Sequence, residues 1–203
     1  MNLARTALLT TTLLLSASLM ARPEVGLPAP DFRAVDTAGN EHSLADFAGS
    51  TLVLEWTNHD CPFVIKHYGS DNMQSLQQRF ADEGVVWLTV ISSAPGKQGH
   101  VSAEEADRLT ETRGAAPTAV LLDPEGTMGR AYDARVTPHM YVIDTEGTLV
   151  YMGGIDSIPS ADPADIPEAV PYVVNALDAV LSGNPIPDTL ILLQMGALRL
   201  LER

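Results

Sequence analysis

Residues 51–68, with the sequence TLVLEWTNHDCPFVIKHY, constrain the fold more than any other part of the chain. Residues 52–56 are apolar apart from Glu55 and too few to form a helix with its own core, so they predict a buried strand. A polar turn follows at residues 57–60. Pro62 then suits the first turn of a helix, because its missing N–H removes a donor that would be unpaired there anyway. The order of strand, turn, Cys-Pro and helix places Cys61 at a helix N-terminus.

A cysteine in this position is well placed for thiol chemistry. The free N–H groups and the dipole of a helix favour an anion at its N-terminus, and the thiolate is the reactive form of cysteine. Cys61 is the only cysteine in the 203 residues, so an internal disulfide is excluded. We therefore predict a redox-active Cys61. The competing interpretation is a small, buried and inert side chain.

The charge balance excludes some classes of partner. The chain has 12 Lys+Arg against 26 Asp+Glu, for a net charge of −14. Its two lysines, Lys66 and Lys97, form no basic cluster that could neutralise phosphates, so we expect no nucleic-acid binding. An anionic membrane surface is disfavoured for the same reason. The hydrophobic content of 45% is enough for one sizeable core, which indicates one domain.

The first 21 residues have the composition of a secretory signal. Arg5 supplies a positive start, and residues 7–15 form an apolar segment that is short for a membrane-spanning helix. Small residues follow, and cleavage near Ser18 or Ala21 is expected. We therefore predict that the protein is periplasmic or secreted, with no stable membrane association after cleavage. A retained anchor is the alternative.

Strand and helix patterns alternate along the rest of the chain. Apolar runs predict strands, helical spacing and a capping box at Ser102 predict helices, and a turn at residues 144–147 predicts a late hairpin. The further predicted strands are residues 31–35, 85–91, 118–122, 140–143 and 148–152. The further predicted helices are residues 72–82, 102–113, 128–132 and 169–181, with one helical turn at 42–47 and a loop at 157–167. This order implies an α/β fold in which helices flank a mixed central sheet.

Three motifs in this order resemble a known family. They are VGLPAPDFRAVDTAGNEHSLADFAG, the strand-turn-Cys-Pro-helix stretch, and VTPHMYVIDTEGTLVY. Together they resemble the redoxin branch of the thioredoxin superfamily, which includes the alkyl hydroperoxide reductase/thiol-specific antioxidant (AhpC/TSA) group. DCPFVIKHYGSDNMQSLQ and SSAPGKQG further resemble an exported bacterial subgroup. The resemblance implies a thioredoxin-like redoxin domain over residues 22–183, after a signal peptide at 1–21 and before a divergent tail at 184–203.

The same resemblance implies a thiol-dependent oxidoreductase with antioxidant activity. Cys61 would reduce a peroxide or exchange with a disulfide, and an external thiol reductant, either a small thiol or a thioredoxin-like protein, would regenerate it. No cofactor and no metal are implied. In this superfamily the proline at Thr137-Pro138 is cis and lies against the active cysteine. The supporting residues are Pro62, Thr137, Pro138, Trp56, Asn58 and His59.

Two departures separate the chain from other members of the superfamily. Val64 occupies the position where thioredoxins carry a second cysteine, so a mixed disulfide at Cys61 would need an outside thiol for its release. Asn58 and Leu54 occupy positions where typical peroxiredoxins have Thr and Pro. The loop that activates peroxide in those enzymes is therefore not reproduced.

Two other classes of function stay open. One is a non-catalytic binding module that keeps the thioredoxin fold and leaves Cys61 inert. The other is a metal-handling protein, in which His59, Cys61, His67 and His139 converge on copper or zinc. If the protein does not bind a metal, we expect His67 to be solvated.

Charged residues near the cysteine give further expectations. Glu55 is either a buried proton-transfer group or an exposed strand residue. Lys66 lies off the helical face of Cys61, so any effect on the thiol would be long-range. The acidic loop around Asp156, Asp162 and Asp165 is expected to be solvated.

Overall fold

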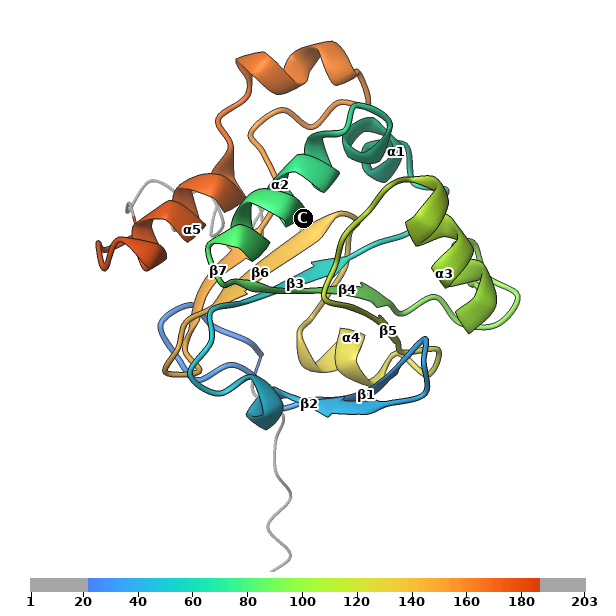
Figure 1. The fold of residues 1–203 in the computed structure, drawn as a ribbon, viewed down its shortest axis with the longest axis horizontal. Helices are drawn as coiled ribbons and strands as arrows, with labels where there is room; N and C mark the ends of the chain where they lie inside the picture. The colour runs from blue at the N-terminus through green and yellow to red at the C-terminus, as the bar shows by residue number, and fades with distance from the viewer. Residues whose placement is uncertain (1–21, 187–203) are drawn as a thin grey trace, which may run out of the picture.

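A computed structural model describes residues 22–186 of the chain (Figure 1). These residues form a seven-stranded mixed sheet with helices on both faces. The predicted signal peptide and most of the predicted tail lie outside the described residues. Within residues 22–186, no helix is long and apolar enough to cross a bilayer.

The sheet has the strand order β2-β1-β5-β4-β3-β6-β7. The strands are β1 Arg33–Asp36, β2 Glu41–Ser43, β3 Leu52–Trp56, β4 Val86–Ile91, β5 Ala119–Leu122, β6 His139–Ile143 and β7 Leu149–Gly153. The helices are α1 Pro62–Gly69, α2 Asn72–Asp82, α3 Ala103–Thr112, α4 Thr127–Ala131 and α5 Tyr172–Leu181, with 3-10 turns η1 Leu44–Phe47 and η2 Pro163–Glu168. β3 pairs in parallel with β4 and antiparallel with β6, so the strand that leads to Cys61 is central.

Alternation along β3 divides the core into two layers. Leu52, Leu54 and Trp56 belong to the cluster that also contains Met128 of α4. Val53 belongs to the opposite cluster, with residues of α1, α2 and α5. Side chains alternate across a strand, so a strand buried on both faces is apolar at nearly every position. In Figure 1, α4 lies below β3, β4 and β5, whereas α1 and α2 lie above these strands.

The structure confirms the predicted fold class and most of the predicted elements. α2 has the predicted bounds, and Ser102 caps α3 by accepting a hydrogen bond from the N–H of Glu105 at 3.2 Å. Two details differ. The region expected to be loop contains η2, because Asp162 Oδ1 accepts from the N–H of Ala164 at 2.9 Å and starts a turn. The last helix begins at Tyr172, directly after Pro171, and not at residue 169.

Candidate active site

Cys61 lies at the start of α1, as the sequence predicts. It is the N-cap residue and half-buried, and Pro62 follows at the first helical position. Its N–H donates to the carbonyl oxygen of Asn58 at 3.0 Å. Its thiol Sγ donates to the carbonyl oxygen of Thr137 at 3.1 Å. The Thr137–Pro138 bond is cis, as expected. The fold therefore places the thiol between a helix N-terminus and the turn that precedes β6.

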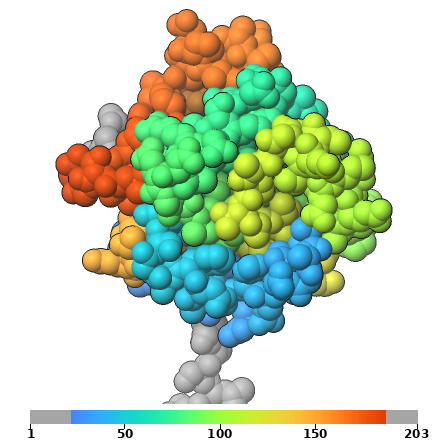
Figure 2. Space-filling model, in the orientation of Figure 1, coloured from blue at the N-terminus to red at the C-terminus, as the bar shows by residue number. Residues whose placement is uncertain are grey.

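The thiol opens into a cavity of about 420 Å³. A cavity of this size suits a small molecule or part of a chain. Most of its wall is apolar, and Phe63 and Val136 are 39% and 49% exposed. The lining residues are Cys61, Phe63, His67, Val136, Thr137, Pro138, Gly154, Ile155, Asp156, Ile158 and Pro159. The chain after β7 thus forms one wall, and the η2 segment that follows it packs against α1 (orange and teal in Figure 2).

Two polar residues of this wall, His67 and Asp156, were both expected to be solvated, and both side chains are largely buried. His67 is 3% exposed and not solvated. The Asp156 side chain is 10% exposed and not solvated either, since it faces the fully buried ammonium of Lys66 at 3.6 Å. Burial lowers the pKa of His67 to about 4, so the ring is neutral at physiological pH. The helical spacing of Val64, His67 and Tyr68 is the sequence signal that would have placed His67 inside.

Two of the predicted supporting residues face a neighbouring cavity. Trp56 and Asn58 line a cavity of about 260 Å³ that shares Thr137 with the cavity of Cys61. The indole N–H of Trp56 donates to Ser92 Oγ at 2.9 Å, and the ring packs edge-on against Tyr141. The side chain of Asn58 accepts from the N–H of Asp60 at 3.0 Å, which shapes the turn before Cys61.

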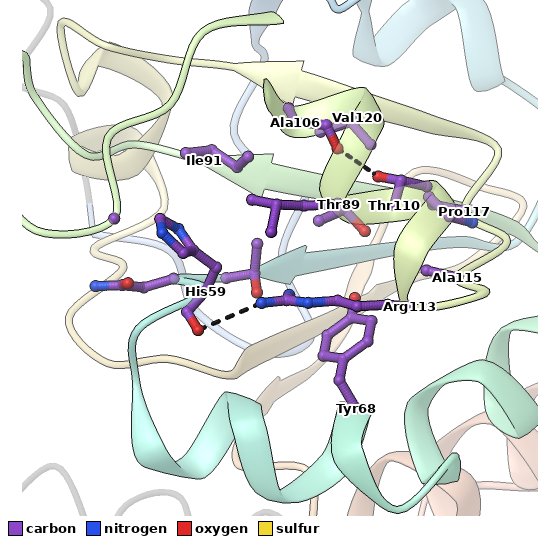
Figure 3. Close-up of a pocket in the computed structure, with 14 residues that line it drawn as sticks. His59, Tyr68, Thr89, Ile91, Ala106, Thr110, Arg113, Ala115, Pro117 and Val120 are labelled. Carbon is purple, nitrogen blue, oxygen red and sulfur yellow. Dashed lines mark hydrogen bonds between the residues drawn. The ribbon is translucent and has the colours of Figure 1, made fainter. Parts of the chain in front are cut away.

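His59 lines a different cavity, shown in Figure 3. Its carbonyl oxygen accepts a hydrogen bond from Arg113 at 3.3 Å, and the Arg113 guanidinium lies over the ring of Tyr68. The cavity has about 30 Å³ of space, which is water-sized and too small for a disulfide. The structure therefore does not bring His59 to the cavity of Cys61.

Glu55 is fully buried, which decides between the two interpretations of its exposure. Its carboxylate accepts hydrogen bonds from Tyr68 at 2.8 Å and from the Trp87 indole at 2.9 Å. Gln77 and Thr89 donate at 3.3 and 3.4 Å. Burial raises the pKa of Glu55 above its usual value, although the four donors oppose the shift. Glu55 does not line the cavity of Cys61.

The candidate metal ligands do not form a cluster. His139 is largely buried, and its Nδ1 lies 2.9 Å from the Tyr141 hydroxyl. Burial lowers its pKa to about 4. In the part of the chain that the structure describes, no group of three or more His, Cys, Asp or Glu side chains is arranged to hold a metal ion.

Comparison with known proteins agrees with this architecture. A structure from Geobacillus kaustophilus, described as an uncharacterized conserved protein, has 27% identity and a TM-score of 0.68, over 81% of this chain and 85% of that one. A hypothetical protein from Sinorhizobium meliloti has 24% identity and a TM-score of 0.70, over 82% and 89%. A structure from Chlorobium tepidum, described as a putative thiol:disulfide interchange protein DsbE, has 21% identity and a TM-score of 0.59, over 78% and 99%.

Among curated proteins, none matches this chain significantly. The model of the AhpC/TSA family matches residues 25–152, which is more than half of the chain. The matched segment runs from the lead-in before β1 through β7 and includes Cys61, Thr137 and Pro138. With its thioredoxin-like sheet and a cysteine at the start of α1, the chain belongs to the AhpC/TSA family.

Proposed function

We propose that this protein is a single-cysteine thiol oxidoreductase that exchanges with disulfides through Cys61. The observation that carries this proposal is the position of the sulfur. Cys61 is half-buried at the N-terminus of α1, and it lines a cavity of about 420 Å³. Both features favour a reactive thiol over an inert one, because reactive cysteines are partly exposed and lie where an anion is stabilised.

The reaction has two exchange steps. The Cys61 thiolate attacks one sulfur of a disulfide, the S–S bond breaks, and the second sulfur leaves as a thiolate that takes a proton from water. The product is a mixed disulfide at Cys61. Val64 occupies the position of a second thiol, so an external thiolate attacks the mixed disulfide and releases Cys61. The net reaction oxidises the external thiol and reduces the disulfide.

Thr137 and Pro138 form the opposite side of the site and restrict the approach to the sulfur. Pro62 starts the helix, and Trp56 and Asn58 support the turn from the neighbouring cavity. His59 is assigned only an indirect role, through the turn. The proposed partners are a disulfide substrate and a small thiol or thioredoxin-like reductant. We further propose export after removal of residues 1–21.

Disulfide exchange is favoured over peroxide reduction by the surroundings of the sulfur. The hydrogen-bond partner of Sγ is the carbonyl oxygen of Thr137, which is an acceptor. Polarising the O–O bond of a peroxide needs donors. Peroxide reduction is the second candidate because the chain belongs to the AhpC/TSA family. It would oxidise Cys61 to a sulfenic acid, which an external thiol would reduce.

Mass spectrometry of the full chain distinguishes these functions. Hydroxyethyl disulfide should add one mercaptoethanol unit at Cys61, and a small thiol should remove it, while Cys61→Ser should gain nothing. A dimedone adduct at Cys61 after limiting peroxide, without a mixed disulfide in the first assay, would favour the peroxidase. A thiol that reacts in neither assay would contradict the proposal and favour the binding module.

A further inference from the structure

Arg113 connects the end of α3 to the turn at residues 57–60, which precedes Cys61. It is the C-cap residue of α3 and is half-buried. Its Nη2 donates a hydrogen bond to the carbonyl oxygen of His59 at 3.3 Å. Figure 3 shows this bond as a dashed line, with the ring of Tyr68 next to the Arg113 side chain. His59 lies two residues before Cys61, so the bond holds the backbone that carries the proposed reactive sulfur.

The other hydrogen bonds of the turn leave its position over α1 open. Two of them are internal, because Asn58 accepts from the N–H of Cys61 through its carbonyl oxygen and from the N–H of Asp60 through its side chain, each at 3.0 Å. A third lies at the start of the turn, where the N–H of Thr57 donates to β4 at 3.0 Å. The bond from Arg113 attaches the turn at a second point, which is closer to Cys61.

Arg113 is itself held by both its side chain and its backbone. The centre of its guanidinium lies 5.0 Å from the centroid of the Tyr68 ring, which is within the range of a cation–π interaction. Tyr68 is buried on α1, and its hydroxyl donates to Glu55 at 2.8 Å. The side-chain amide of Gln74 donates to the carbonyl oxygens of Arg113 at 2.7 Å and Tyr68 at 2.9 Å. Arg113 thus couples the turn before Cys61 to the buried part of α1.

These contacts suit the shape of a guanidinium. The group is planar and carries its N–H donors in the plane, so its face can stack on a ring while its edge donates to a carbonyl oxygen. A lysine ammonium is a compact and strongly hydrated charge, which makes the same pair of contacts less well. Arg113 does not line the cavity of Cys61, so its contacts act on the turn and not on a molecule in that cavity.

We propose that Arg113 is a positioning residue for disulfide exchange at Cys61. This inference rests on the proposed function. By holding the carbonyl oxygen of His59, Arg113 keeps Cys61 at the N-terminus of α1 with Sγ beside Thr137, where the cavity gives a disulfide access to it. Without this bond the turn adopts other conformations, and the fraction of molecules with the sulfur aligned for attack falls.

The rate of mixed-disulfide formation between the full chain and hydroxyethyl disulfide tests the proposal. It is measured as a function of pH up to the plateau at which Cys61 is fully ionised. In Arg113→Met we expect the plateau rate to fall about tenfold, the factor given by one hydrogen bond of ordinary strength. Arg113→Lys keeps a donor and a charge, so its plateau rate should lie between those of Arg113→Met and the unmodified protein.

Arg79→Met is the matched control. Arg79 also lies over an aromatic ring, with its guanidinium 4.6 Å from the centroid of the Phe80 ring, and it pairs with Glu83 and Asp178. These partners lie on or beside α2 and α5, away from the turn before Cys61. Arg79→Met therefore removes the same kind of side chain without touching the turn, and its plateau rate should equal that of the unmodified protein. Urea unfolding of each variant confirms that it is folded.

The pH profile separates positioning from an effect of charge alone. A positive charge that only favoured the thiolate would change the midpoint of the profile, because it would change the pKa of the thiol. Its loss would leave the plateau unchanged, since Cys61 is fully ionised there. A lower plateau rate in Arg113→Met is therefore the result expected of a positioning residue. A shifted midpoint with an unchanged plateau would contradict the proposal.

The outcomes separate this inference from the proposed function. If the unmodified protein exchanges and a folded Arg113 variant keeps its plateau rate, the positioning role is wrong and the exchange function stands. If Arg113→Met fails to fold, the comparison of Arg113→Lys with the unmodified protein decides alone. A plateau that Arg79→Met lowers as much as Arg113→Met would also contradict the positioning role. If the unmodified protein does not exchange at all, both proposals are wrong.

Discussion

The thiol of Cys61 donates a hydrogen bond to the carbonyl oxygen of Thr137 across 3.1 Å, although the two residues are 76 positions apart in the chain. The contact joins the N-terminus of α1 to the turn before β6. Strand pairing brings these ends together, because β3 and β6 are antiparallel neighbours with Trp56 opposite His139. The position of the proposed reactive sulfur thus follows from the register of two central strands.

The buried ion pair predicts very different effects for the two lysines. Lys66→Met should lower the free energy of unfolding by about 3–5 kcal/mol, because it leaves the Asp156 carboxylate buried without its counter-ion. Lys97→Met, at an exposed position, should change it by less than about 0.5 kcal/mol. Urea unfolding measures both.

The double variant Lys66→Met with Asp156→Asn should recover most of the stability lost in Lys66→Met, because no unpaired charge is left. A double variant as unstable as the sum of the two single variants would show that the two side chains do not interact.

Burial of Glu55 predicts a pH dependence of stability. Burial raises the pKa of Glu55 in the folded protein above its ordinary value of 4.5, which applies to the unfolded chain. At a pH between 4.5 and the raised pKa, Glu55 keeps its proton in the folded protein and loses it in the unfolded chain. This proton binding stabilises the folded protein at low pH, and the stabilisation is lost as the pH rises through the raised pKa. In Glu55→Gln this loss should be absent. The difference in unfolding free energy between the unmodified protein and Glu55→Gln should thus shrink as the pH rises above 4.5.

Urea unfolding of both proteins across the mildly acidic to neutral range checks this prediction. Glu104→Gln, at an exposed helix position, is the control. Asp36 and Asp46 do not interfere, because hydrogen bonds lower the pKa of each and both are ionised throughout this range. A difference that stays constant with pH would mean that the pKa of Glu55 is not raised.

Gly99 predicts a steric link to the turn before Cys61. Its φ of +80° is strained for any other residue, and an added Cβ would lie 2.5 Å from the side chain of Asn58. Gly96 has a similar φ of +76° but open space around it. Gly96→Ala should therefore cost about 1–2 kcal/mol from the backbone alone. Gly99→Ala should cost about 1–3 kcal/mol more, because Asn58 must move.

Asn58 holds the backbone of Asp60 and Cys61, so Gly99→Ala should also change the rate at which iodoacetamide alkylates Cys61. Gly96→Ala should not. Equal rates in both variants would show that the turn does not respond to a shift of Asn58.

Local patterns in the sequence were enough to predict much of the fold. The apolar run of β3, Pro62 at the start of α1 and the Ser102 cap each depend on neighbouring residues, and each is present in the structure. The polar wall of the cavity was not predictable in this way. Asp156 lies in a loop with an acidic composition, and its burial depends on Lys66, which is 90 residues earlier in the chain. Local composition carries no information about that pairing.

His59 was predicted to support the Cys61 site, but it lines a different cavity. Its position two residues before Cys61 made it a candidate for the site, but the turn directs it toward the cavity below α3. Adjacency in sequence does not predict where a side chain points at a turn. The periodicity of a helix or strand does predict it. The exposure of Glu55 was undecided for a related reason, because a charged residue in an apolar strand can face either a buried network or solvent.

The most direct test of the central claim compares the reactivity of Cys61 in the folded and the unfolded protein. The full chain is mixed with hydroxyethyl disulfide at about pH 7, with and without concentrated urea, and formation of the mixed disulfide is followed by mass spectrometry. A thiol activated by the N-terminus of α1 should react about tenfold faster in the folded state. Slower reaction in the folded state would mean that the fold shields Cys61 and would contradict the proposed function.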